Sequence, residues 1–313
     1  MNDEYNKKKK SSIKQKFIRF WRTDSGKMSL VRDIVIALLL VLILLTALWA
    51  YTGQWWGAPM VAIESGSMMH PNEPYGRYGT IDAGDMVLLV KVNTKSDVVP
   101  RGSSIHGTME REDKENYFYG DYGDVIVYHP YGMKNTDQII HRAMCWVEVN
   151  KDGVDTTYNV SDYSIFNQPS ITISELGLKD YKPSHSGFIT KGDNNEICDQ
   201  ASPELCTEPI KVEWISGKAR LEIPWIGTIN LFFNDITSGG NTVSNVPGDC
   251  IQCLIILIVI LISIPIILDA YDYYKNKKKN PPIDEDYIEP ETYPDNKIDP
   301  SSEEIEKHID EKF

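Results

Sequence analysis

The 313-residue sequence has little cysteine and no excess of positive charge, and each shortage excludes a kind of site. It contains 32 Lys and Arg against 45 Asp and Glu, a formal net charge of −13, whereas binding to a nucleic-acid backbone requires clustered positive charge. Among the five cysteines, the Cys250-x-x-Cys253 pair lacks the second pair that a zinc site requires. The sequence therefore predicts no nucleic-acid partner, no metal and no other cofactor.

The sequence does contain two uncharged apolar runs, residues 34–52 and 250–268, each of 19 residues. As a helix with a rise of about 1.5 Å per residue, each would span roughly 28 Å, close to the ~30 Å core of a bilayer. Both are predicted to be transmembrane helices. A cleavable signal peptide is the alternative for the first run, although its apolar region would normally be about 7–15 residues long. A buried or re-entrant hairpin is the alternative for the second run, which contains Pro265.

The charges flanking the two runs predict their orientation. Residues 1–33 carry ten basic and four acidic side chains, and a second cluster of lysines lies at positions 275–279. Basic segments next to a membrane helix stay in the cytoplasm, so both termini are predicted to be cytoplasmic and the chain to be a two-helix protein of the cell membrane. The tail, residues 269–313, has seven basic and fourteen acidic residues and is predicted to be disordered after the lysines. Residues 53–249 are then left outside the cytoplasm.

The predicted extracytoplasmic segment is rich in short β-branched or alternating apolar stretches separated by turns. Two polar stretches, at about 94–122 and 150–185, are interpreted as insertions or as a small appended subdomain. The fold class is therefore predicted to be mostly β, a mixed barrel or sheet with polar insertions, flanked by two transmembrane helices. The predicted strands are residues 85–92, 124–129, 138–149, 187–190 and 213–223.

Three of the cysteines lie in this segment. Cys198 and Cys206 are eight positions apart in a polar loop outside the membrane, where a disulfide could persist, and spacing alone leaves that bridge open. Cys145 lies in an apolar run and is predicted to be a small buried hydrophobe.

Two polar residues of the segment have the chemistry of a nucleophile and its base. Ser67 follows Gly66, which lets the backbone turn sharply and expose the next hydroxyl. An ordinary Ser-Gly-Ser turn is the alternative. His141 lies within a β-branched strand, where partial desolvation suits a neutral imidazole that accepts a proton. A hydrogen-bonded structural histidine is the alternative there.

An acid-bearing loop, residues 190–199, follows the predicted strand at 187–190 and contains Asp193 and Asp199. A structural Asx-turn is one interpretation, and a calcium loop is another, although the acids lack the full EF-hand spacing. Asp199 could instead hold the imidazole of His141 in the correct tautomer. The order Ser, His, Asp in one domain supplies the minimum set for acyl transfer.

Seven short blocks, in this order along residues 60–230, make the chain resemble type I signal peptidases, and most closely their archaeal and endoplasmic-reticulum branch. His141 indicates the branch, because bacterial relatives have a lysine at the corresponding point of the strand. The blocks are Ser65-Gly66-Ser67-Met68, residues 84–87, residues 123–126, Ile140-His141-Arg142, residues 190–195, residues 217–220 and residues 224–227.

The resemblance implies a membrane-anchored serine endopeptidase whose substrates are preproteins bearing signal peptides, with small residues one and three positions before the cut. It implies Ser67 as the nucleophile, His141 as the general base and Asp199 as the orienting acid, with Asp193 as a supporting residue. The division of labour between the two acids stays open.

Stabilisation of the oxyanion is expected from the turn that holds Ser67: main-chain N–H groups around Gly66 and Met68, together with the Ser65 hydroxyl. Two other functions stay open from the sequence. One is a non-catalytic membrane-anchored β module that binds or assembles envelope components. The other is a serine protease that cleaves regulatory membrane proteins.

Overall fold

The computed structural model describes residues 26–55, 59–70, 74–106, 116–151 and 155–279, together with Ile18 and Trp21. The chain divides into two compact units, Met1–Ile258 and Val259–Phe313. Most of the predicted basic N-terminus, and the predicted tail from residue 280 onward, lie outside the described residues.

Two long helices contain the apolar runs. Helix α2 is Gly26–Thr52 and helix α5 is Gly248–Lys279, and both are long and apolar enough to cross a membrane. Pro265 lies inside α5, which is one continuous helix and not a hairpin. α5 extends beyond the apolar run and ends at Lys279, in the cluster of lysines after which disorder was predicted.

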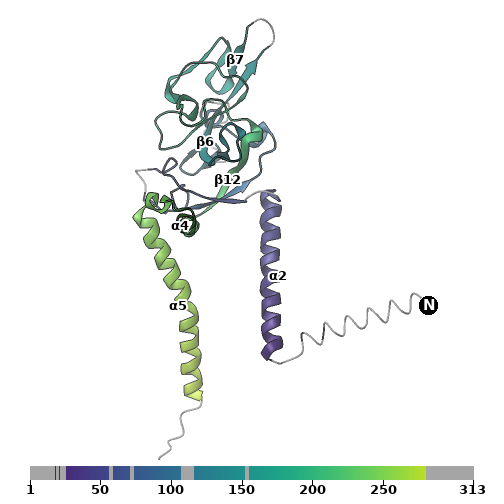
Figure 1. Cartoon of the computed structure of the whole chain (residues 1–313), viewed down its shortest axis with the longest axis vertical. Helices are drawn as coiled ribbons and strands as arrows, with labels where there is room; N and C mark the ends of the chain where they lie inside the picture. Colours follow the sequence, from purple (N-terminus) through teal and green to yellow (C-terminus); the bar gives the residue numbers. More distant parts are fainter. Residues whose placement is uncertain are drawn as a thin grey trace, which may run out of the picture. The chain divides into compact units, whose positions relative to one another are not determined.

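An eight-stranded antiparallel sheet is the largest sheet of the first unit (Figure 1). Its order is β1-β2-β12-β5-β6-β7-β8, with β11 paired to β6. Within the described residues it does not close, so the predicted mixed barrel or sheet is here an open sheet. Each of the five predicted strands lies on a strand of this sheet. The strands are β1 (Met60–Ala62), β2 (Met86–Val90), β5 (Val125–Tyr128), β6 (Ile139–Asn150), β7 (Thr157–Val160), β8 (Ile165–Gln168), β11 (Gly187–Lys191) and β12 (Ile215–Ile223).

Strand β6 is the longest of the sheet and has three antiparallel neighbours. Its first residues pair with β5, its middle with β11 and its end with β7. The run predicted as residues 138–149 is long enough to reach all three, and its apolar residues are buried on both faces in the middle of the strand. β6 therefore connects the part of the sheet that carries His141 with the part built from the second polar insertion.

The first polar insertion forms short elements around the start of this sheet. They are the 3-10 helix η1 (Lys95–Asp97), helix α3 (Arg101–His106) and the hairpin of β3 (Tyr117–Phe118) with β4 (Asp121–Tyr122). Residues 107–115 lie outside the described residues.

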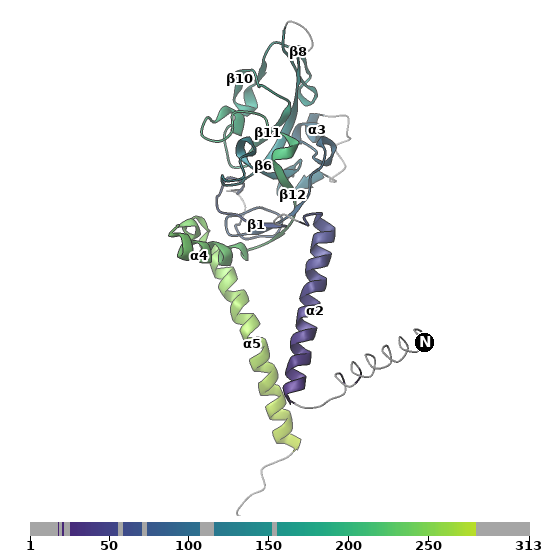
Figure 2. The ribbon, with the colours of Figure 1, turned by 45° about the vertical axis from the view of Figure 1, so that its right-hand side comes forward.

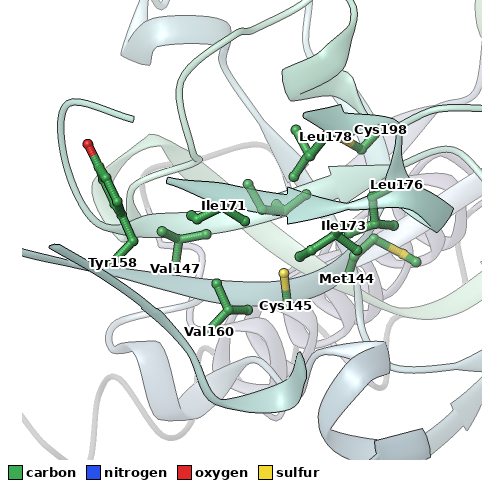
Figure 3. Close-up of a cluster of buried hydrophobic side chains, with 11 residues drawn as sticks. Met144, Cys145, Val147, Tyr158, Val160, Ile171, Ile173, Leu176, Leu178 and Cys198 are labelled. Atoms are coloured by element: carbon green, nitrogen blue, oxygen red, sulfur yellow. The ribbon is translucent and has the colours of Figure 1, made fainter. Parts of the chain in front are cut away.

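The second polar insertion has an apolar core of its own against the end of β6 (Figure 3). Besides β7 and β8 it contains the hairpin of β9 (Ile171–Ile173) with β10 (Leu178–Tyr181). Alternate residues of β7 and β9 are buried, which explains why a polar stretch still buries apolar side chains. The cluster contains Met144, Cys145, Val147, Tyr158, Val160, Ile171, Ile173, Leu176, Leu178, Ile189 and Cys198.

The cysteines of the first unit are reduced. Cys145 is fully buried, as predicted. Cys198 and Cys206 are free thiols, so the disulfide that the sequence left open is absent. Cys198 packs in the cluster of the second insertion and Cys206 in another cluster with Ile126 and Phe188, and each thiol is covered by apolar side chains.

Helix α4, Gly227–Ser238, was not among the sequence predictions. It follows β12 and ends at Gly239, whose φ of 73° is the left-handed conformation that glycine tolerates at a helix C-terminus. Its residues Thr228 and Leu231 are buried.

Candidate active site

The structure brings Ser67, His141 and Asp199 into one line of hydrogen bonds. Oγ of Ser67 lies 3.0 Å from Nε2 of His141, and Nδ1 of the same ring lies 2.7 Å from Oδ2 of Asp199. The three residues are 74 and 58 positions apart along the chain, so this arrangement is produced by the fold and not by a local turn. The imidazole can accept a proton from the serine at one nitrogen while its other nitrogen donates to the carboxylate.

The turn that carries Ser67 is anchored on its apolar side. Met68 is buried in a cluster with Ile63 and Val87, and the main-chain N–H of Met69 donates to the carbonyl of Gly66. With Met68 directed into the core, the preceding hydroxyl is exposed to the site. Oγ of Ser65 lies 3.3 Å from Oγ of Ser67. Among the described residues, no acceptor is paired with the main-chain N–H of Ser67 or Met68.

His141 is held near the start of β6, where it pairs with Ile126 of β5. Its side chain is almost completely buried, so that water has little access to the ring. Consecutive residues of a strand point to opposite faces, and Arg142 therefore lies on the other side of β6 from the imidazole. The strand that places the candidate base thus also places a buried cation behind it.

Asp199 opens a 3-10 helix, η6 (Asp199–Ala201), and is fully buried. Its Oδ2 accepts three hydrogen bonds: from His141, from the hydroxyl of Tyr128 at 2.7 Å and from Oγ1 of Thr190 at 2.6 Å. Burial, and then the charge of Asp199, raise the pKa of Tyr128 well above its usual value, so this hydroxyl stays protonated and donates. Three donors on one oxygen fix the carboxylate facing the imidazole.

Thr190 reaches Asp199 because of an irregularity in β11. The pairing of β11 with β6 shifts register between Ile189 and Thr190, as in a β-bulge, which redirects the side chains that follow. The main-chain N–H of Thr190 donates to Oε1 of Gln200 at 2.9 Å. Gln200 therefore ties η6 to the end of β11 and keeps Asp199 beside Thr190.

The loop after β11 closes over the serine turn. The main-chain N–H of Asn194 donates to the carbonyl of Ser67 at 2.8 Å, and its side-chain amide donates to the carbonyl of Gly66 at 3.1 Å. Gly192 lies so close to the site that an added Cβ would be 2.7 Å from the carbonyl oxygen of Ser67 and 2.8 Å from Nε2 of His141. Only glycine fits at this position without moving the serine or the imidazole.

Asp193 lies in the same loop but takes a different partner. Its carboxylate accepts from Nε and Nη2 of Arg142 at 2.8 and 2.5 Å, and it lies 3.1 Å from Nε2 of His70. Burial opposes the charge on Asp193, but hydrogen bonds from Arg142 and His70 outweigh it and lower the pKa of this carboxyl. Asp193 thus neutralises a buried cation, whereas Asp199 contacts the imidazole.

Arg142 connects this ion pair to the first polar insertion. The guanidinium is fully buried and donates to five main-chain carbonyls of the β3–β4 hairpin and the residues that follow it. These acceptors are the carbonyls of Phe118, Tyr119, Asp121, Tyr122 and Gly123. The Arg142–Asp193 ion pair therefore links the β3–β4 hairpin to the loop whose Asn194 bonds to the serine turn.

Ser67 and His141 lie in the wall of a cleft of about 680 Å³. One bank of the cleft is β1 with the residues that follow it, and the other is the segment 136–141 at the start of β6. Its lining contains Met60, Val61, Ala62, Ile63, Glu64, Ser65, Met86, Val127, Thr136, Asp137, Gln138, Ile139, Ile140, Asn195, Leu205 and Asn230.

Both banks present strand edges that are unpaired among the residues that the structure describes. Pro59 and Ile63, on either side of β1, are hydrogen-bonded to the segment that contains β2. Main-chain groups alternate in direction along a strand, so those of Met60 and Ala62 are directed away from β2. In β6, Ala143 bonds toward β5, so the main-chain groups of Ile140 are directed to the opposite side, before the pairing with β11 begins. An extended peptide in the cleft can therefore pair with main-chain groups.

The cleft is acidic at one end. Glu64 and Asp137 both line it. Burial, followed by the charges of Asp137 and Asp235, raises the pKa of Glu64 above its usual value. A substrate segment without acidic side chains therefore suits this end of the cleft better than an acidic one.

Of the residues that the sequence predicted for the site, Ser65, Ser67 and His141 line this cleft, and Asp199 lies behind the imidazole. Asp193 does not line it: its carboxylate pairs with Arg142 and lines a second cavity beside His70. Tyr128 was missed because it ends an apolar strand, and its role is visible only once Asp199 lies beside it. Arg142, Thr190, Gly192 and Asn194 stood in the blocks that carry the resemblance, yet the sequence alone assigned no task to them. No protein-family model and no curated protein matches this chain.

Proposed function

We propose that the protein is a membrane-anchored serine endopeptidase that removes N-terminal signal peptides from exported preproteins. The observation that carries the proposal is the unbroken line of hydrogen bonds from Ser67 through His141 to Asp199, in the wall of a cleft with free strand edges. A nucleophile, a base and an orienting acid in this geometry are the parts that acyl transfer requires.

The chemistry runs through an acyl-enzyme. His141 Nε2 accepts the hydroxyl proton of Ser67 as Oγ bonds to the carbonyl carbon of the scissile peptide, and Asp199 stabilises the imidazolium through Nδ1–H. The C–N bond then breaks, and the imidazolium gives its proton to the leaving amine. Water attacks the acyl-enzyme with His141 again as base, which releases the new carboxyl terminus and restores the serine.

The oxyanion of each tetrahedral intermediate needs donors near Ser67. The main-chain N–H groups of Ser67 and Met68 have no acceptor among the described residues, and the Ser65 hydroxyl is within reach of the Ser67 oxygen. These groups are the proposed oxyanion site. Gly66 contributes by allowing the turn that presents them.

The substrate class follows from the cleft and the two apolar helices. A peptide bound in the cleft must be extended to pair with the strand edges, as the segment around a leader cleavage site can be. Ser67 is 67 − 52 = 15 residues after the end of α2, so the proposed nucleophile stays near the surface of the bilayer that α2 would cross. An apolar signal segment in the same bilayer is thereby concentrated beside the site.

The membrane arrangement completes the proposal. α2 and α5 cross the membrane, with the basic N-terminus and the acidic C-terminal tail in the cytoplasm and the sheet outside it. The resemblance to the archaeal and endoplasmic-reticulum branch of type I signal peptidases supports this arrangement, the histidine base and small substrate side chains before the cut.

The test uses the full chain in liposomes with a preprotein that carries an Ala-x-Ala site. The wild type is expected to release the mature protein, while the Ser67→Ala and His141→Ala variants lose about 10⁴-fold or more in kcat. Ser96→Ala, at an exposed serine of η1, is the matched control and should remain fully active.

Three outcomes would contradict the proposal. A wild type that binds envelope components but cleaves nothing would favour a non-catalytic module. Ser67-dependent cleavage of other membrane proteins, with intact preprotein, would favour a regulatory protease. Full activity of His141→Lys would remove the specific role of the imidazole.

A further inference from the structure

Helix α4 has an apolar face that nothing covers in the described part of the chain. Ile229, Phe232, Phe233 and Ile236 are 39, 53, 61 and 64% exposed. Their spacing of i, i+3, i+4 and i+7 puts them within an arc of about 100° on the helix surface. Large apolar side chains gathered in this way mark a surface that contacts something other than water.

The other sides of α4 are either buried against the body of the protein or polar. Thr228 and Leu231 are buried against the body, and the exposed Asn230 and Asn234 lie on a third, polar side. The single charged residue, Asp235, accepts the main-chain N–H groups of Thr242 and Val243 at 2.9 Å. Its charge is therefore directed into the following loop and not onto the apolar face.

The position of α4 in the fold identifies the partner. Leu231 packs in one cluster with Val246 and Cys250, and Cys250 lies in the first turn of α5. Figure 2 shows α4 beside this end of α5. The candidate membrane span begins at Gly248, so α4 is packed against the point where the chain would enter the bilayer. A helix that is fixed there and has one apolar face lies in the membrane interface.

We propose that α4 is an interfacial helix that inserts Ile229, Phe232, Phe233 and Ile236 into the outer boundary of the bilayer. The partner is the lipid itself. Because α4 carries no lysine or arginine, the contact depends on apolar insertion and does not require anionic lipids.

The same helix reaches the cleft. Asn230, on the polar side of α4, lines the cleft that contains Ser67 and His141. If the proposed peptidase function holds, α4 fixes the height of that cleft above the lipid, so a substrate enters it directly on leaving the bilayer. This last step rests on the proposed function, whereas the insertion of α4 does not.

The insertion is tested with the full chain in phosphatidylcholine liposomes. Phe233→Cys and Asn234→Cys are labelled with a thiol-reactive fluorophore, and the unsubstituted chain, labelled in parallel, gives the background from its own thiols. Lipids brominated in their acyl chains should quench the label at position 233 severalfold more than the label at 234. Aqueous iodide should give the opposite order, and neither result should change when anionic lipid is added.

Equal quenching by iodide at both positions would overturn the proposal, because α4 would then face water. Protection of position 233 from both quenchers would overturn it as well, because a protein partner or a second copy would then cover the face.

A second measurement addresses the coupling to the cleft. The double variant Phe232→Glu with Phe233→Glu should slow cleavage of a membrane-inserted preprotein severalfold and leave cleavage of a short soluble peptide unchanged. Asn234→Glu is the control. Quenching without any cleavage by the wild type would refute the peptidase and retain the interfacial helix, so failures of the two proposals are distinguishable.

Discussion

The main-chain N–H of Asn194 donates to the carbonyl oxygen of Ser67, which joins the loop after β11 to the turn that carries the serine. The two residues are far apart in sequence, yet the Ser67–His141 distance depends on both segments. A change in the loop is therefore expected to act on the proposed nucleophile without touching it.

Gly192→Ala is the sharpest test of that dependence. The added Cβ would collide with the Ser67 carbonyl and with Nε2 of His141, so the serine and the imidazole must separate. We expect kcat for preprotein cleavage to fall about 100-fold, the cost of a displacement near 1 Å, with the fold retained by circular dichroism. Gly248→Ala, at a glycine with open space around it, should be unaffected. Full activity of Gly192→Ala would contradict the site geometry.

The hydroxyls of Tyr128 and Thr190, which both donate to Asp199, are expected to position its carboxylate. Thr190→Val and Tyr128→Phe each remove one hydrogen bond to Oδ2, and each should lower kcat about tenfold with KM unchanged. Thr190→Ser restores the donor and should recover most of the activity. If Thr190→Val and Thr190→Ser were equally impaired, the hydroxyl would have no positioning role.

Asp199→Asn should mainly lower activity, whereas Asp193→Asn should mainly lower stability. Asp199→Asn is expected to lower kcat about 10⁴-fold with little change in the melting temperature. Asp193→Asn leaves Arg142 buried without its anion, which costs about 3 kcal/mol and lowers the melting temperature by roughly 6–12 °C. The same melting loss in both variants would contradict this division.

The pH dependence of stability gives a further check on Asp193. Because its folded pKa is below its ordinary value of 3.8, the stability it contributes is present above that pH and is lost as the pH falls through the lowered pKa. Between pH 5 and 3 the wild type should lose more stability than Asp193→Asn.

Glu222 should produce the opposite trend. Burial, and then the charges of Asp85 and Asp82, raise its pKa from 4.5 to about 8, although the N–H of Gly79 donates to its Oε1. The folded state then binds a proton that the unfolded state has released, so stability falls as the pH rises from about 4.5 to 8. Glu222→Gln should raise the melting temperature by a few degrees at pH 9 and leave it unchanged at pH 5.

An exposed glutamate provides the control for that measurement. Glu213 lies in η7 (Val212–Trp214) with its side chain exposed, and Glu213→Gln is the matched control for the substitution itself. A Glu222→Gln variant that is stabilised equally at both pH values would contradict the raised pKa.

The strands of the sheet were predictable because their apolar residues stand at the positions that the sheet buries. β5 is a run of four buried residues, and β6 is a long apolar run that fills the middle of the sheet. Closure was not predictable, because a strand has the same pattern in a barrel as in an open sheet. β1 and β8 end the sheet, and only the pairing reveals that.

The residue types of the site were predictable, and the resemblance implied that Asp199 orients His141, but the division of labour between Asp193 and Asp199 stayed open. Asp193 and Asp199 follow the same strand in one loop, so spacing alone could not assign them. The assignment in space depends on Arg142, which lies behind β6 and takes Asp193. Tyr128 gave no signal, because a tyrosine at the end of an apolar strand is common.

α4 was missed although its sequence contained the relevant pattern. The apolar residues at 229, 232, 233 and 236 have helical spacing, but the twelve-residue segment is short and rich in Asn and Thr, which are weak helix formers. Its packing against the start of α5 makes the helix stable.

The adjacency of His141 and Arg142 on β6 makes the site sensitive to chain length. A slip of one residue in the pairing of β5 with β6 would exchange the two side chains, putting a guanidinium beside the serine and an imidazole among the hairpin carbonyls. Insertions or deletions between residues 124 and 142 should therefore be tolerated poorly during evolution. The stretch from 150 to 185 follows the end of β6, beyond His141 and Arg142. Changes in its length or sequence therefore leave the positions of these two side chains unaltered.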